Sequence, residues 1–417
     1  MRRVRLAVVG AGSRGSGYAQ WTLEHPDRAE LVAVADPRGE ARDRIGDEHH
    51  LPGGARFDDW RELLRGGVAE RLALDGVVIC TQDRDHHDPA VAFANAHIDI
   101  LLEKPISPTE QEVREVVEAV QKGGVAFVVA HVLRYTPYAQ ALRRIVQTGR
   151  LGRITSIEHL EPVGYWHFAH SYVRGNWSRV EDSSSLLMAK SSHDIDWLRY
   201  IVGKPFSRVS SFGSLTYFTP ENAPEGAGRR CVDCAAEPDC IFSALKIYLP
   251  RVGEFPASVI TTDQTPEGVA AAIETGPYGR CVYYCDNDVP DHQVVAMEFA
   301  DGTTGTFTLA GLSIRTNRHT RIFGSSATLV GNGETYTITD FATGVTETFD
   351  PFAGQEPGYH GGGDEAVMDA FVTAIETGDP SSIASGPAES LETHLAVFAA
   401  ERARLAGTVE YVEPVAS

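Results

Sequence analysis

Three glycines near the N-terminus are the first residues whose spacing indicates chemistry. Gly10, Gly12 and Gly15 follow the apolar run at residues 4–9 in the pattern Gly-x-Gly-x-x-Gly. Such a loop, placed between a buried strand and a helix, lets the backbone approach a pyrophosphate and directs a helix N-terminus at its charge. The same loop contributes two polar side chains, Ser13 and Arg14. The pattern predicts a dinucleotide site, and the alternative is a glycine-rich turn without a ligand.

An acidic residue follows the next apolar run, at residues 31–35. The carboxylate of Asp36 can accept hydrogen bonds from both ribose hydroxyls, and it would repel a 2′-phosphate. This favours NAD over NADP as the dinucleotide. Arg38 weakens this preference for NAD, because its guanidinium could bind the 2′-phosphate of NADP.

Alternating strand and helix patterns surround these residues. Apolar runs at 76–80, 98–102 and 125–130 are separated by helical patterns, which predicts a doubly wound parallel sheet. After about residue 150 the pattern is mostly strand, and helices return at the end of the chain. The expected strands of this half are 153–160, 206–218, 243–249, 257–263, 281–285, 293–300, 303–310, 320–324, 326–330 and 335–341, and the expected final helices are 364–377 and 388–405.

Short polar motifs follow the later strands and add up to a family resemblance. They are Thr81-Gln82-Asp83-Arg84-Asp85-His86, Glu103-Lys104-Pro105, Arg134-Tyr135-Thr136-Pro137 and Gly149-Arg150-Leu151-Gly152. Their order resembles the Gfo/Idh/MocA family over nearly the whole chain. The resemblance implies an α/β Rossmann domain at residues 1–130. It also implies an α+β domain at 131–417 for substrate binding and oligomerisation, with a large, open, mostly antiparallel sheet.

The resemblance further implies hydride transfer between a nicotinamide and a sugar or cyclitol hydroxyl. Lys104 would touch both the cofactor and the reacting hydroxyl, where an ammonium stabilises developing alkoxide charge. His193 matches the general base of the family, since a neutral imidazole can take the hydroxyl proton; the alternative is a helix-capping or core histidine. The cofactor contacts are expected at Gly10, Gly12, Ser13, Arg14, Gly15, Asp36, Arg38, Thr81, His86, Glu103 and Lys104.

The residues ahead of this histidine depart from the family pattern. Ala189 stands where the family usually has an aspartate, and Lys190 follows it. Lys190 and Tyr172 are therefore further catalytic candidates. The alternative for Lys190 is an ion pair with Asp194 or Glu181.

A second polar stretch has the chemistry of a sugar site. Arg174, Asn176 and Trp177 supply fork donors, an amide and a stacking face, and His170 precedes them. We expect these four residues to contact a carbohydrate substrate, and the alternative is domain core. Arg174, with His170 and Lys190, could hold an anionic substituent such as a sulfonate.

Two other functions stay open. Some relatives resemble NAD-dependent glycoside hydrolases, including enzymes of sulfoquinovosides, which oxidise a sugar hydroxyl transiently, usually at C3. The ketone acidifies the neighbouring C–H, the glycosidic group is eliminated, water adds, and the hydride returns. A non-enzymatic nucleotide sensor on a Rossmann scaffold is the third hypothesis, because fold alone does not fix function.

Five of the six cysteines lie between residues 231 and 285. Cys231, Cys234 and Cys240 have the spacing Cys-x2-Cys-x5-Cys, and Cys281 or Cys285 could complete a tetrahedral set. This predicts a structural zinc, with buried or reduced thiols as the alternative.

Composition narrows the choice of partners. With 37 Lys+Arg against 57 Asp+Glu, the formal net charge is -20, which argues against nucleic acid or an anionic membrane surface. No apolar run approaches the roughly 20 residues of a membrane helix. We therefore expect a cytoplasmic protein, and the resemblance implies a homodimer or homotetramer.

Overall fold

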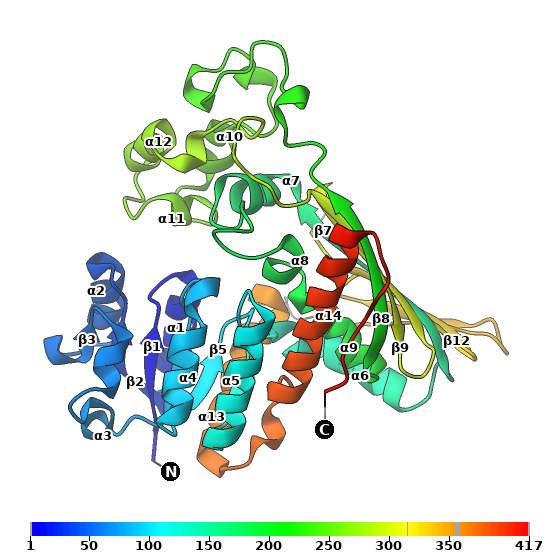
Figure 1. Cartoon of the computed structure of the whole chain (residues 1–417), viewed down its shortest axis with the longest axis horizontal. Coiled ribbons are helices and arrows are strands. Elements are labelled where there is room, and N and C mark those ends of the chain that lie inside the picture. Colours follow the sequence, from blue (N-terminus) through cyan, green and yellow to red (C-terminus); the bar gives the residue numbers. More distant parts are fainter. Residues whose placement is uncertain (1, 315, 355–358, 416–417) are drawn as a thin grey trace.

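The computed structural model describes residues 2–314, 316–354 and 359–415, which form two sheets with their helices (Figure 1). The first sheet is parallel throughout and has the order β3-β2-β1-β4-β5-β6. Because the order reverses between β1 and β4, ligands of such a sheet bind beyond the carboxyl ends of these two strands. The strands are β1 (Val4–Val9), β2 (Ala29–Ala35), β3 (Arg56–Phe57), β4 (Gly76–Ile79), β5 (Asp99–Leu102) and β6 (Phe127–Val129).

Helices connect the strands of this sheet, as the alternating sequence pattern predicts. In α5 the buried side chains Val113, Val116, Val117 and Val120 recur at helical spacing and cover the sheet. Thr109 caps the helix by accepting a hydrogen bond from the backbone N–H of Glu112. The helices are α1 (Ser13–Glu24), α2 (Gly39–Glu48), α3 (Val68–Leu72), α4 (His87–Asn95) and α5 (Glu110–Gly123).

The second sheet has nine strands in the order β14-β13-β12-β11-β7-β10-β9-β8-β15. Its neighbours are antiparallel except β7 and β10, which run parallel. Alternating burial along β9 and β10 gives the sheet one covered face. The strands are β7 (Ile154–Gly164), β8 (Phe206–Ser214), β9 (His292–Phe299), β10 (Thr304–Ser313), β11 (His319–Gly324), β12 (Ala327–Gly331), β13 (Tyr336–Asp340), β14 (Thr346–Phe349) and β15 (Glu410–Tyr411).

Three of the expected strands are wrong. Residues 243–249 and 257–263 contain helices instead, and 281–285 is irregular chain. Short apolar runs do not distinguish a buried strand from a buried helix, and here the side chain of Ser243 caps a helix by accepting from Lys246 N. The helices of this half are α6 (Pro137–Gln147), α7 (Tyr165–Phe168), α8 (Leu186–Ala189), α9 (Ser192–Val202), α10 (Ala244–Tyr248), α11 (Ala257–Ile260), α12 (Pro266–Thr275), α13 (Gly363–Thr377) and α14 (Pro387–Ala406).

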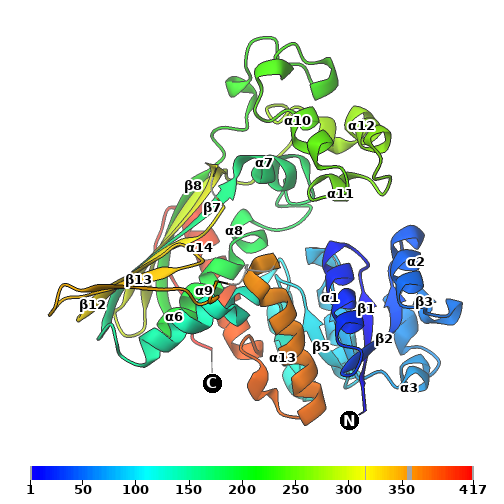
Figure 2. The ribbon, with the colours of Figure 1, turned by 180° about the vertical axis from the view of Figure 1, so that it is seen from behind.

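The short helices α7 and α10 to α12 form a separate group beside the carboxyl ends of the parallel strands, with α8 between this group and the first sheet (Figure 1). Figure 2 shows α13 lying against the first sheet near α1. Phe371 of α13 shares an apolar cluster with Leu6 and Val8 of β1. The C-terminal part of the chain thus completes the core of the parallel sheet. The domain boundary between residues 130 and 131 stays a prediction. Within the described residues, no helix has both the length and the apolar character to cross a membrane.

Candidate functional site

The glycine loop between β1 and α1 leaves no space for side chains at two positions. A Cβ on Gly10, whose φ is 97°, would lie 2.4 Å from the carbonyl oxygen of Cys80. A Cβ on Gly15 would lie 1.9 Å from the carbonyl oxygen of Gly10. Gly12 is the N-cap of α1 and carries no capping side chain, and Ser13 begins the helix. The backbone N–H groups at this helix end are thus placed as a pyrophosphate requires.

Asp36 stands directly after β2 and is buried beside the glycine loop. Its Oδ2 accepts from Ala11 N at 2.6 Å, and its Oδ1 accepts from Arg38 Nε at 3.0 Å. Burial alone would raise the pKa of Asp36, but the hydrogen bonds from Arg38 and Ala11 outweigh it and lower the pKa. The carboxylate is therefore ionised and fixed at the loop, and Arg38 is its ion-pair partner.

Arg14 connects the glycine loop to two other segments. Its Nε donates to Glu103 Oε1 at 2.6 Å, and its Nη2 donates to Asp364 Oδ1 at 2.6 Å. Burial raises the pKa of Glu103, but Arg14 and Lys104 oppose this and lower it. Both expected cofactor contacts, Arg14 and Glu103, therefore form an ion pair that joins the loop to the Glu-Lys-Pro motif and to α13.

His86 joins the remaining cofactor motifs. Its Nδ1 lies 2.6 Å from the carbonyl oxygen of Pro105, and its Nε2 lies 3.1 Å from the carbonyl oxygen of Thr81. The Thr81 hydroxyl donates to Asp85 O at 3.0 Å. The histidine is buried, and it holds the loop after β4 against the segment that carries Lys104.

Lys104 and His193 lie close to each other at the carboxyl edge of the parallel sheet. Lys104 Nζ donates a 2.6 Å hydrogen bond to the carbonyl oxygen of Ala189, which ends α8. His193 stands in the first turn of α9, and within the described residues its buried Nδ1 has no hydrogen-bond partner. Removal from water and the charge of Lys104 lower the pKa of His193 well below 6.5. The imidazole is thus neutral at pH 7 and able to accept a proton.

A network of charged side chains continues from this pair. Lys190 Nζ is 2.9 Å from Glu161 Oε1, so the partner of Lys190 is Glu161 rather than Asp194 or Glu181. Arg318 Nε lies 3.0 Å from Glu161 Oε2 and 2.6 Å from Asp194 Oδ1. Sequence reasoning missed both Glu161 and Arg318. For Glu161 a signal was available. His159 and Glu161 are two residues apart on β7, so their polar side chains lie on the same buried face of the strand.

The expected substrate residues separate into two groups. The ring of Trp177 is 6.3 Å from that of Tyr172, and its Nε1 donates to Asp83 Oδ1 at 3.4 Å, so both aromatic residues lie beside the loop after β4. His170 and Arg174 instead face the group of short helices. His170 stacks on Tyr278 at 4.9 Å.

Arg174 donates from Nε to Arg280 O at 2.7 Å and from Nη2 to Phe242 O at 2.7 Å, and these carbonyls lie just after α12 and just before α10. Asn176 is exposed. Arg174 is thus bound within this group, and Arg318 is the guanidinium that stands beside Glu161 and Lys190.

Four of the six cysteines come together around one small cavity. Cys231, Cys234, Cys240 and Cys281 line one cavity of about 10 Å³ together with Arg174. Across the part of the chain that the structure describes, no group of three or more His, Cys, Asp or Glu side chains is arranged to hold a metal ion. Burial raises the pKa of Cys240 and of Cys281, which favours protonated thiols there. The predicted structural zinc is therefore not supported.

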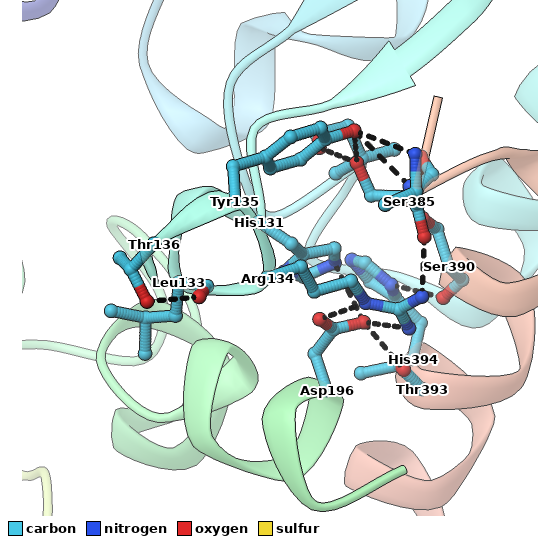
Figure 3. Close-up of polar contacts among 12 residues, drawn as sticks. His131, Leu133, Arg134, Tyr135, Thr136, Asp196, Ser385, Ser390, Thr393 and His394 are labelled. Atoms are coloured by element: carbon cyan, nitrogen blue, oxygen red, sulfur yellow. Dashed lines mark hydrogen bonds and ion pairs between the residues drawn. The ribbon is translucent and has the colours of Figure 1, made fainter. Parts of the chain in front are cut away.

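Asp196, three residues after His193 on α9, has a structural position. It accepts from Arg134 Nε at 2.6 Å and from Arg134 Nη2 at 2.7 Å, and Thr393 donates to it at 3.0 Å (Figure 3). Figure 3 also shows His131 and His394 beside this pair. The buried ion pair links α9 to α14 and to the Arg-Tyr-Thr-Pro segment, so it positions the helix that carries His193.

These groups define a class of protein. A Rossmann sheet with a glycine loop and an acidic residue after β2 accommodates a dinucleotide, and Lys104 and a neutral His193 lie at the same carboxyl edge of the sheet. The family comparison agrees: residues 4–131 match the "Oxidoreductase family, NAD-binding Rossmann fold" model, and residues 143–388 match the "Oxidoreductase family, C-terminal alpha/beta domain" model. The chain belongs to this Gfo/Idh/MocA family.

Individual relatives are similar over part of the chain. The scyllo-inositol 2-dehydrogenase (NAD(+)) of Bacillus subtilis (strain 168) is 28% identical over 51% of this chain and 58% of its own. The levoglucosan dehydrogenase of Pseudarthrobacter phenanthrenivorans is 25% identical over 55% of this chain and 58% of its own. This chain thus spans a little over half the length of the curated relatives it matches.

A solved levoglucosan dehydrogenase, in complex with NADH and L-sorbose, has the same fold. Its TM-score is 0.72 with 18% sequence identity, and the match covers 100% of both chains. At this level of identity the likeness concerns the fold alone. The cytoplasmic location and the homodimer or homotetramer stay predictions.

Proposed function

We propose that this protein is an NAD-dependent oxidoreductase that transfers hydride between a carbohydrate hydroxyl carbon and the nicotinamide. The observation that carries the proposal is the hydrogen bond from Lys104 to the carbonyl of Ala189, which places the ammonium at the segment that leads into the neutral His193. A bound NAD would accept or return the hydride. Of the predicted cofactor contacts, Gly10, Gly12, Gly15 and Asp36 have the geometry that would hold it.

The proton and the charge are handled by the protein. His193 takes the hydroxyl proton, because burial and the charge of Lys104 keep its imidazole neutral. Lys104 stabilises the alkoxide that develops on the same oxygen. Its ammonium is held by the carbonyl of Ala189, which leaves its other two N–H groups for the substrate and the cofactor.

The relatives support a carbohydrate substrate, since their names specify scyllo-inositol and levoglucosan. We infer a sugar, a glycoside or a cyclitol for this chain. A substrate with an anionic substituent fits the cationic side chains Lys190 and Arg318 near the base.

A redox glycoside hydrolase is the second candidate, and one observation favours it. The ion pair of Lys190 with Glu161 supplies an additional acid–base pair where the family aspartate is replaced by Ala189. After oxidation at C3, removal of the neighbouring proton would expel the glycosidic group, water would add to the alkene, and the hydride would return. Oxidation and reduction then cancel, and the net reaction is hydrolysis.

One experiment separates these candidates. The protein, loaded with NAD+, is mixed with D-glucose, scyllo-inositol, levoglucosan and aryl glycosides, including sulfoquinovosides, while reduced nicotinamide and released aglycone are both followed. Accumulation of NADH without aglycone supports the dehydrogenase. Aglycone release that requires NAD+ but accumulates no NADH supports the hydrolase. If the protein binds NAD+ but forms neither NADH nor aglycone with any of the compounds, both enzymatic functions are contradicted. The nucleotide sensor is then the remaining hypothesis.

A further inference from the structure

Arg318 is fixed beside the proposed base by two carboxylates. It stands directly before β11, and its Nε lies 2.6 Å from Asp194 Oδ1 and 3.0 Å from Glu161 Oε2. Asp194 follows His193 in the first turn of α9, and Glu161 also holds Lys190. The two cationic groups therefore flank one buried carboxylate at the same end of the site.

Most donors of this guanidinium are unused. A guanidinium carries five N–H groups, and the one on Nε donates to Asp194 Oδ1. Among the residues that the structure describes, Nη1 and Nη2 of Arg318 have no hydrogen-bond partner, and the side chain is 22% exposed. The free Nη1–Nη2 edge is a planar fork that matches two oxygens of a carboxylate or a sulfonate.

Lys190 offers a second contact on the same side. Its side chain is 18% exposed, and its one ion-pair partner among the described residues is Glu161. Glu161 and Asp194 offset the charges of Lys190 and Arg318 when no ligand is present, so the fork is oriented before a ligand arrives. Such preorganisation improves affinity, because the side chain loses little freedom on binding.

We propose that Arg318, together with Lys190, binds an anionic oxygen-bearing substituent of the carbohydrate and so determines the specificity of the site. This inference rests on the proposed function, which supplies the premise that the ligand is a carbohydrate. The shared ligand chemistry is a group with one negative charge and at least two equivalent oxygens. A hexuronic acid supplies it as a carboxylate, and a 6-sulfonated hexose supplies it as a sulfonate.

The test measures binding and therefore does not depend on turnover. Calorimetry with the NAD+-loaded protein compares D-glucuronate with D-glucose, D-galacturonate with D-galactose, and 6-sulfoquinovose with D-glucose. We expect at least one anionic member to bind about tenfold or more tightly than its neutral partner, as charge-assisted hydrogen bonds imply. The pair that shows the preference identifies a carboxylate or a sulfonate as the ligand group.

Two variants assign the preference to the fork. Arg318→Gln removes the positive charge. Arg318→Lys keeps a positive charge beside Glu161 but removes the planar pair of donors, so this variant can be used if Arg318→Gln fails to fold. Both are expected to reduce the preference to less than about threefold. Arg321→Gln is the matched control, since Arg321 lies on β11 with its side chain 62% exposed and should keep the preference.

The inference is overturned if no anionic sugar binds more tightly than its neutral partner, if Arg318→Lys keeps the preference, or if Arg321→Gln loses it equally. Failure of the proposed function has a different signature. It would appear as binding of the sugars without any NADH or aglycone formation.

Discussion

Lys104 donates a 2.6 Å hydrogen bond to the main-chain carbonyl of Ala189, at the position where the family usually carries an aspartate. A carbonyl oxygen positions the ammonium, but it cannot take up and release a proton in catalysis. The proton of the substrate hydroxyl must therefore be taken by another group, and His193 is the neutral acceptor nearby. Under the proposed function this relationship separates the roles of the two residues: Lys104 would stabilise charge, and His193 would take the proton.

Replacing Lys104 with Met should lower kcat/KM by about 100- to 1000-fold, the effect of removing one preorganised donor to a developing oxyanion. Binding of NAD+ should change much less, because the glycine loop and Asp36 remain. Steady-state kinetics and cofactor titration measure the two effects. Lys122→Met is the control, since Lys122 is exposed on α5 and its loss should leave both quantities unchanged. Equal activity of Lys104→Met and the unaltered protein would be incompatible with the assigned role.

The pH dependence of kcat/KM should report the lowered pKa of His193. Burial and Lys104 depress this pKa well below 6.5, so the histidine is already neutral at pH 6.5. Because the base acts when unprotonated, kcat/KM should be flat through pH 6.5 and fall only in more acidic solution. His193→Gln should lose about 100- to 10,000-fold of activity and show no such acidic limb. An acidic limb centred at or above pH 6.5 would contradict this assignment.

Asp36→Ser should weaken NAD+ binding about tenfold, since two hydrogen bonds to the ribose are lost. Serine can still accept the hydrogen bond from Ala11 N, which limits the damage to the loop. Binding of NADP+ should become tighter, because the repelling carboxylate is gone and Arg38 is released from its ion pair. Fluorescence titration with both cofactors gives the ratio. Adding Arg38→Gln to this variant should abolish the gain for NADP+, and a gain that persists would exclude Arg38 as its source.

Asp196→Asn should lower the free energy of unfolding by about 3–5 kcal/mol, because it leaves the charge of Arg134 buried without a partner. Urea denaturation measures the change. Glu298→Gln removes the exposed partner of Arg208 and should leave the midpoint nearly unchanged.

The same pair should make stability depend on pH in acid. Burial opposes ionisation of Asp196, but Arg134 and His131 prevail and lower its pKa below the ordinary value of 3.8. Its contribution to stability is thus complete above that value and is lost as the pH falls through the lower pKa of the folded state. Stability of the Asp196→Asn variant should lack this part of the acid dependence, and an identical acid profile would show that the pair does not contribute.

The sequence predicts the cofactor side of the site better than the substrate side. The glycine loop and Asp36 are local motifs whose geometry follows from a strand, a turn and a helix. Arg174 is different: it has the chemistry of a sugar contact, but it lies in a segment whose packing against Phe242 and Arg280 depends on distant residues. Glu161 and Arg318 are 157 residues apart in the sequence and meet only because β7 pairs with β11.

The zinc prediction and the misassigned strands have related causes. Cysteine spacing places thiols near one another along the chain, but it does not give the distances that coordination requires. The apolar runs near 243–249 and 257–263 likewise fit a strand or a helix equally well, and tertiary packing selects the helix.

The most direct test of hydride transfer is isotopic. The panel compound that gives the largest reaction is prepared with deuterium at its hydroxyl-bearing carbons and incubated with the NAD+-loaded protein for a single turnover. Mass spectrometry then reads the reduced cofactor. The proposed function predicts one deuterium in the NADH formed, and labelled NADH that forms about 100-fold or more slowly with His193→Gln. Product formation without any deuterium in the cofactor, or no reaction with any compound of the panel, would contradict it.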